Sequence, residues 1–119
     1  MANTQNQLSE FQIQMVFHQW CKKSNFIILS WHVPNGLKSA PEYVKKMKLI
    51  GLTRGIPDYW IILKNNKILA IEFKTSIGKL SEEQEEIKAI LNNNPYIHYR
   101  ECRSSHEAVS FVKEMMEIN

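Results

Sequence analysis

The residues best suited to chemistry are two carboxylates and a lysine in the middle of the chain. Asp58 directly precedes the apolar run YWIIL, and Glu72 and Lys74, two positions apart, close the next apolar run. Paired carboxylates supply the oxygen ligands that Mg²⁺ and Mn²⁺ prefer. A metal ion held there can polarise a phosphodiester and lower the pKa of a bound water, and a nearby lysine can stabilise charge that develops on the attacked phosphate. The three side chains are therefore candidates for phosphodiester hydrolysis.

A β-hairpin would bring these three side chains together. The sequence predicts one strand that starts at Asp58 and a second over 67–75, with a turn at Asn65-Asn66, because Asn tolerates the positive φ of tight hairpin turns. The end of the second strand then lies beside the start of the first. Glu72 and Lys74 share one strand face because side chains alternate. The alternative is an ordinary Glu-x-Lys pair on an exposed face, which the apolar neighbours do not favour.

Two further polar residues lie in the first turns of predicted helices. Ser81-x-x-Gln84 and Ser9-x-x-Gln12 both have the capping-box pattern that begins a helix. The simplest role of Gln84 is to close its own capping box. The simplest role of Glu10 is to place a negative charge at the positive end of the first helix.

The remaining patterns predict an α/β fold with the element order α-β-α-β-β-α-β-α. Besides the hairpin and the two helices above, we expect strands over 26–32 and 96–102, a helix over 39–50 capped by Ser39, and a last helix that begins at Ser104. This order favours a mixed sheet of about four strands flanked by helices. The last strand should return parallel through a right-handed crossover. We expect one domain over 1–119, with 1–7 as a disordered tail.

The order of the motifs resembles the VRR-NUC nuclease family. The chain contains, in sequence, Gly55-Ile56-Pro57-Asp58, then Glu72-Phe73-Lys74, then Gly78-Lys79-Leu80-Ser81-x-x-Gln84. A PD…ExK pair alone is a weak signal, but the string G-x-PD…E-x-K…G-x-L-S-x-x-Q is more specific, and the likeness covers nearly the whole chain. The family belongs to the restriction-endonuclease-like PD-(D/E)xK group, so the resemblance implies a restriction-endonuclease-like core.

The resemblance also implies a catalytic set, which would be Glu10, Asp58, Glu72, Lys74 and Gln84. The two hairpin carboxylates would bind Mg²⁺ or Mn²⁺ together with the backbone carbonyl of Phe73. Glu10 would reach the metal centre directly or through water. The lysine would steady the attacking water and the transition state, and the glutamine would orient them. Hydrolysis would leave a 5′-phosphate and a 3′-hydroxyl.

Positive charge is concentrated around the candidate carboxylates. Residues 22–79 contain eleven Lys and Arg against three acids, whereas 80–119 contain four against eight, within an overall net charge of +3. A basic field suits an enzyme that acts on a polyanion, although a solvated lysine-rich surface would look the same. Related nucleases keep a similar Pro-Asn stretch and basic insert before the hairpin. The DNA-contact candidates are Asn35, Lys45, Lys46, Lys48 and Arg54.

Composition places the chain among ordinary globular proteins. Hydrophobic residues make up 44% and charged residues 23%. No apolar run approaches the length of a membrane span, and no signal peptide precedes the polar start, so we expect a cytoplasmic protein without membrane association. Cys21 and Cys102 lack metal-ligand spacing and are expected to be free thiols.

The hypothesis that follows is a metal-dependent DNA endonuclease. Minimal members of the resembled family are similar to Holliday-junction resolvases, whereas members embedded in larger repair proteins favour flaps. Because one small active site cannot cut two strands symmetrically, we expect a homodimer that prefers four-way or other branched DNA. The alternatives are a flap nuclease, a catalytically silent DNA-binding accessory module, and a sequence-specific component of a restriction or mobile-element system. The small size would suit a virus or mobile element.

Overall fold

A computed structural model describes residues 8–34 and 40–117. The expected tail over 1–7, Asn35 and the predicted cap Ser39 lie outside the described residues. The elements, in chain order, are α1 (Glu10–Lys23), β1 (Ile27–His32), α2 (Pro41–Leu49), β2 (Tyr59–Leu63), β3 (Ile68–Phe73), α3 (Glu82–Asn92), β4 (Ile97–Cys102) and α4 (Ser105–Met115). This is the order that the sequence predicts.

One four-stranded sheet with the order β1-β2-β3-β4 organises the chain. β1 pairs antiparallel with β2, β2 pairs antiparallel with β3, and β4 pairs parallel with β3. The predicted hairpin and the predicted parallel return are both present. Asn66 has a φ of 69°, as the turn requires. The mixed α/β class is therefore confirmed.

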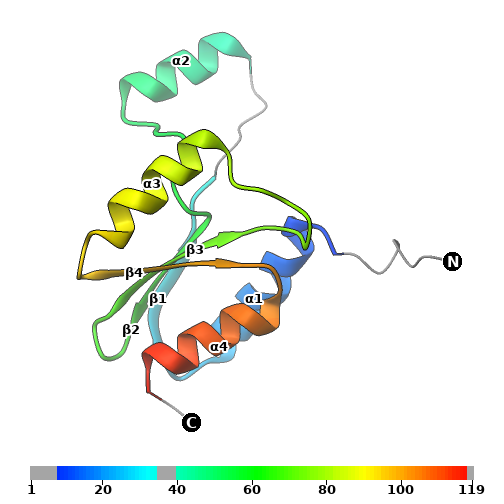
Figure 1. The fold of residues 1–119 in the computed structure, drawn as a ribbon, viewed down its shortest axis with the longest axis vertical. Helices are drawn as coiled ribbons and strands as arrows, with labels where there is room; N and C mark the ends of the chain where they lie inside the picture. The colour runs from blue at the N-terminus through cyan, green and yellow to red at the C-terminus, as the bar shows by residue number, and fades with distance from the viewer. Residues whose placement is uncertain (1–7, 35–39, 118–119) are drawn as a thin grey trace, which may run out of the picture.

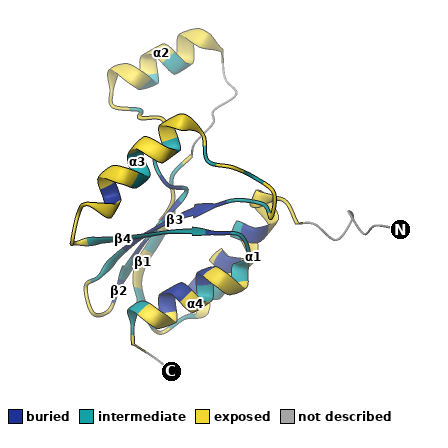
Figure 2. Ribbon diagram, in the orientation of Figure 1, coloured by how far each residue is buried: buried dark blue, intermediate teal, exposed yellow. Residues whose placement is uncertain are grey.

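Helices cover both faces of the sheet. α1 and α4 lie against one face, and α3 lies on the other (Figure 1). The main core lies between the sheet and the α1–α4 pair, where Phe17 contacts the rings of Tyr59 and Phe73 at centroid distances of 5.5 and 5.7 Å. β3 is covered on both sides, so residues 69–73 are all buried (Figure 2). Glu72 therefore lies in an interior strand.

α2 differs from the other helices because it buries none of its residues. It projects beyond α3, away from the sheet, and is exposed along most of its length (Figures 1 and 2). Its N-cap is Ala40, with no side-chain hydrogen bond at the cap, and the predicted cap Ser39 lies outside the described residues. Pro41 at the first turn begins the helix, since its fixed φ suits that position.

Both cysteines are free, as expected, and both are buried. Within residues 8–34 and 40–117, no helix has the length and apolar character needed to cross a lipid bilayer.

Candidate active site

The end of the β2–β3 hairpin brings Asp58 beside Glu72. Asp58 directly precedes β2, and its Oδ2 accepts a hydrogen bond of 2.9 Å from the backbone N–H of Phe73. Asp58 thus bridges to the neighbouring strand at the point where the ladder ends. Glu72 precedes Phe73 on β3 and is only 2% exposed. The exposed Glu-x-Lys alternative does not describe this strand.

The two oxygens of Glu72 have different surroundings. Oε2 accepts a hydrogen bond of 3.1 Å from Gln84 Nε2. Oε1 is buried and, among the described residues, has no hydrogen-bond donor. The pKa of Glu72 is raised to about 9, mainly by burial and next by Asp58, because two neighbouring carboxylates repel when both are charged and share a hydrogen bond only when one is protonated. Lys74 opposes this shift and Glu10 adds to it more weakly.

These features fit a divalent cation. A buried carboxylate oxygen without a donor is costly, and a hard cation between two carboxylates satisfies it while cancelling their repulsion. Among the described residues, no three His, Cys, Asp or Glu side chains form a metal-binding group. Glu10, exposed at the start of α1, therefore does not join Asp58 and Glu72 as a third clustered carboxylate. A site here would draw on the hairpin pair and on main-chain oxygen such as the Phe73 carbonyl.

Lys74 lies at the end of β3 on the side of the carboxylates. Its backbone N–H donates to the carbonyl of Cys102 over 3.0 Å, which fixes it against β4. The side chain is half-buried, and its positive charge lowers the pKa of Glu72. An ammonium near the carboxylate pair is what the sequence predicts.

Gln84 fulfils two roles with opposite ends of one amide. Its Oε1 accepts from the backbone N–H of Ser81 at 2.8 Å, and Ser81 Oγ accepts from the Gln84 N–H at 3.1 Å, which completes the predicted capping box. Its Nε2 donates to Glu72. The simplest role expected from the sequence, closure of the capping box, is confirmed, and the same amide also contacts Glu72. The cap holds the amide rigidly against the carboxylate.

A close backbone contact couples the loop before Asp58 to the start of α3. Gly55 has a φ of +88°, and a Cβ at this position would lie 2.5 Å from the Glu83 carbonyl oxygen and 2.9 Å from the Gln84 nitrogen. Only glycine fits both the conformation and the space. The glycine of the G-x-PD motif thus allows the loop before Asp58 to pack closely against the first turn of α3, which carries Gln84.

Arg103 and Glu101 are site-adjacent residues that the sequence interpretation missed. Arg103 Nη1 donates to the carbonyls of Thr75 and Gly78 at 2.7 and 2.6 Å, and its Nη2 pairs with Glu101. Glu101 lies opposite Glu72 in the β3–β4 register. The arginine therefore fixes the loop that follows Lys74 and also neutralises a carboxylate beside Glu72. The spacing Glu-x-Arg on the last strand was the signal available in the sequence.

The basic DNA-contact candidates lie apart from the carboxylates. Lys45, Lys46 and Lys48 are exposed on α2, and Arg54 is exposed in the loop that leads to Asp58. Within the described part of the chain, none of the four forms an ion pair. Asn35 lies outside that part. These cations are available to an anionic partner.

Comparisons with known proteins bear on the fold. No protein-family model matches the sequence, and no curated protein matches it. A solved structure described as "VRR_NUC domain protein" superposes with a TM-score of 0.75 at 20% sequence identity, and the match covers 96% of this chain and 93% of that one. The resemblance read from the motifs is thus matched in three dimensions, and the chain has the restriction-endonuclease-like fold of a VRR_NUC domain protein.

Proposed function

We propose that this chain is a divalent-metal-dependent DNA endonuclease. The observation that carries the proposal is the Asp58–Glu72 pair, in which Glu72 is buried and its Oε1 has no donor among the described residues. A structural protein has little use for such an arrangement, since a buried unpaired carboxylate costs stability. The fold shared with a VRR_NUC domain protein supports nuclease activity as the function of this pair.

Each side chain of the site has a role in this proposal. Asp58, Glu72 and the Phe73 carbonyl would hold Mg²⁺ or Mn²⁺, with Glu10 in contact through water. When bound, the ion would polarise the phosphodiester and lower the pKa of an attacking water. Lys74 would place positive charge beside the phosphate as negative charge develops. Gln84 would hold the Glu72 carboxylate in position, and hydrolysis would leave a 5′-phosphate and a 3′-hydroxyl.

DNA would be bound by exposed cations on α2 and on the loop before Asp58. The exposed side chains of Lys45, Lys46, Lys48 and Arg54 lie on α2 and on the loop before Asp58, and we place Asn35 with them as a DNA contact. Phosphate contacts of this kind give affinity without sequence preference. Cleavage should therefore weaken steeply as salt is raised.

Branched DNA is the substrate class that we favour, with a homodimer as the active form. Each chain carries one carboxylate pair, so paired cuts across a four-way junction require two copies. Exposed apolar side chains on the edge strand β1, among them Leu29 and Trp31, are available for contact with a second copy. A flap nuclease and a catalytically silent accessory module are the alternatives that the experiment below separates.

End-labelled four-way junction, flap and linear duplex should be incubated with the protein in Mg²⁺, Mn²⁺ or EDTA. Wild type, Asp58→Ala, Lys74→Ala and the control Lys79→Ala, which removes an exposed lysine from the same loop, are compared. We expect metal-dependent, paired nicks on the junction by wild type and the control, and no cutting but retained binding by the other two. Flap cutting alone would support the flap alternative. Cutting at the wild-type rate by Lys74→Ala would contradict the site.

A further inference from the structure

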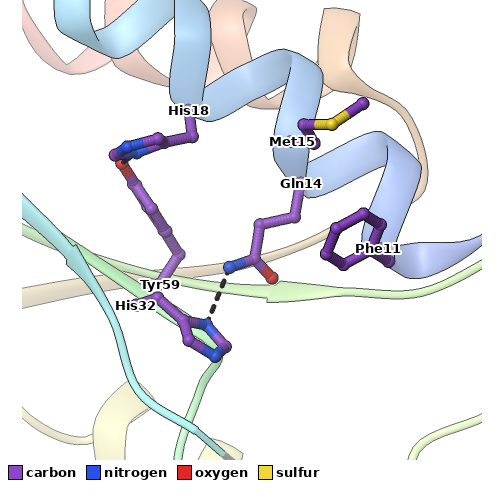
Figure 3. A pocket seen from close by; sticks show the side chains of 6 residues that line it. All are labelled: Phe11, Gln14, Met15, His18, His32 and Tyr59. Carbon is purple, nitrogen blue, oxygen red and sulfur yellow. Dashed lines mark hydrogen bonds between the residues drawn. The ribbon is translucent and has the colours of Figure 1, made fainter.

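A pocket opens between α1 and the ends of β1 and β2. Its volume is about 290 Å³. Four residues of α1 and two of the strands line it, namely Phe11, Gln14, Met15, His18, His32 and Tyr59 (Figure 3). This volume is near the lower end of the range for small-ligand sites, which suits one heterocyclic ring. None of the six residues is acidic.

One side of the pocket holds polar groups that hydrogen-bond one another. His18 Nδ1 lies 2.5 Å from the Tyr59 hydroxyl, which donates to Ser30 Oγ over 2.9 Å. Because the Tyr59 hydroxyl donates its hydrogen bond to Ser30, it accepts one from the imidazole N–H of His18. The Tyr59 hydroxyl is therefore already paired, and Gln14 and His32 also line the pocket with polar groups.

The rim carries groups that can recognise the edge of a ring. His32 Nδ1 lies 2.8 Å from the Gln14 amide and 3.1 Å from the backbone carbonyl of Asp58. One ring nitrogen cannot accept from an amide N–H and also donate to a carbonyl, so the amide orientation and the histidine tautomer are linked. In either state His32 Nε2, which has no partner among the described residues, remains for a ligand.

The outer wall is apolar and exposed. Phe11 is 75% exposed and Met15 is 43% exposed, although both belong to a helix whose opposite side forms the core. Figure 3 shows the Phe11 ring beside the Gln14 side chain, which reaches His32, with His18 and Tyr59 on the far side. An exposed aromatic face near polar groups is the arrangement by which proteins stack an unpaired base and read its edge.

We propose that this pocket holds one unstacked nucleobase of the DNA substrate, an inference that rests on the proposed nuclease function. The pocket lies at the end of the sheet that carries Asp58 and Glu72, because His32 contacts the Asp58 carbonyl and Phe11 follows Glu10. Taking a base out of the stack costs least where pairing is already broken. The pocket would thereby favour branch points over continuous duplex without reading sequence.

The test measures coupling between Phe11 and a single base. A branched DNA that wild type cuts is prepared with one abasic nucleotide, moved position by position around the cut. Binding is measured by fluorescence anisotropy with Lys74→Ala, which should bind without cutting, and with the same protein carrying Phe11→Ala, Phe11→Tyr or Tyr96→Ala. Tyr96 is an equally exposed aromatic residue, 78% against 75% for Phe11, and it precedes β4 at the other end of the sheet.

At one nucleotide the abasic lesion should weaken binding roughly 5- to 150-fold, the range for loss of one base–aromatic stack. Phe11→Ala should weaken binding of intact DNA by a similar factor and be insensitive to that lesion. Phe11→Tyr and Tyr96→Ala should behave like the parent.

Two results would overturn the pocket assignment and leave the nuclease proposal intact. In one, Phe11→Ala and the abasic lesion each reduce DNA affinity independently of the other. In the other, no position of the lesion reduces DNA affinity. The pocket assignment would also be overturned if Phe11→Ala changed the oligomeric mass without any coupling to the abasic lesion, because Phe11 would then belong to a subunit contact. If wild type cuts no DNA with any metal, the lesion is moved around the branch point of a four-way junction instead; coupling there would overturn the nuclease and keep the pocket.

Discussion

Replacing Glu72 with Gln should stabilise the metal-free protein at neutral pH. The wild-type carboxyl is buried beside Asp58, and its pKa is raised from 4.5 to about 9. A glutamine has nearly the same shape, can accept the hydrogen bond from Gln84 through its oxygen, and can donate to Asp58 through its amide. The substitution therefore removes the charge problem while keeping the hydrogen bonds.

The magnitude follows from linkage between ionisation and folding. Because the folded pKa is higher than the unfolded value, this group's contribution is fully present below pH 4.5 and is lost as pH rises towards 9. At pH 7, about 2.5 pH units above the unfolded pKa, the loss is about 3 kcal/mol. Burying a neutral amide retains part of the cost, so Glu72→Gln should gain about 1–3 kcal/mol, or roughly 4–12 °C in Tm.

Urea unfolding in EDTA at pH 5, 7 and 9 measures this directly. The stability difference between Glu72→Gln and wild type should grow with pH, whereas Glu86→Gln, which changes an exposed carboxylate on α3, should show no such trend. Added Mn²⁺ should stabilise wild type and the control but not Glu72→Gln, because binding to N alone raises stability. A difference that stays constant from pH 5 to 9, or a less stable Glu72→Gln at pH 9, would refute the reasoning.

Two further predictions concern the residues that position the site. Gly55→Ala should lose about 2–4 kcal/mol of stability and most cleavage activity, since its Cβ meets the Glu83 carbonyl at 2.5 Å. Gly51→Ala, also at positive φ but with no atom within 4 Å, should lose only about 1–2 kcal/mol, and equal losses in denaturant unfolding would argue against the clash. Arg103→Lys should lower single-turnover cleavage with unchanged DNA affinity, because a lysine cannot hold Thr75, Gly78 and Glu101 together; a wild-type cleavage rate would remove Arg103 from the positioning role.

The hairpin and its carboxylates could be predicted from sequence because their information is local. The turn at Asn66, the alternation along β3 and the spacing of Glu72 and Lys74 all act within about one hairpin. The capping boxes at Ser9 and Ser81 are equally local, and both form. Element order then gives the parallel return of β4, because a strand–helix–strand unit has few other routes.

The contacts that hold the site together depend on distances that the sequence does not contain. Arg103 reaches carbonyls 28 and 25 residues earlier, at Thr75 and Gly78, only because β4 lies beside β3. Gly55 matters because a helix backbone passes within van der Waals distance of it. The double role of Gln84 depends on the reach of one amide, and the burial of Glu72 depends on helices that cover both faces of the sheet.

The central claim is that Asp58 and Glu72 together hold a divalent ion, and the most direct measurement is a crystal structure of wild type soaked in Mn²⁺. We predict an anomalous peak between the two carboxylates, with Glu72 Oε1 as one ligand at an oxygen–metal distance of roughly 2.0–2.2 Å. The peak should vanish in Glu72→Gln. Absence of the peak in wild type at saturating Mn²⁺, with the two carboxyl groups sharing a proton instead, would contradict the account.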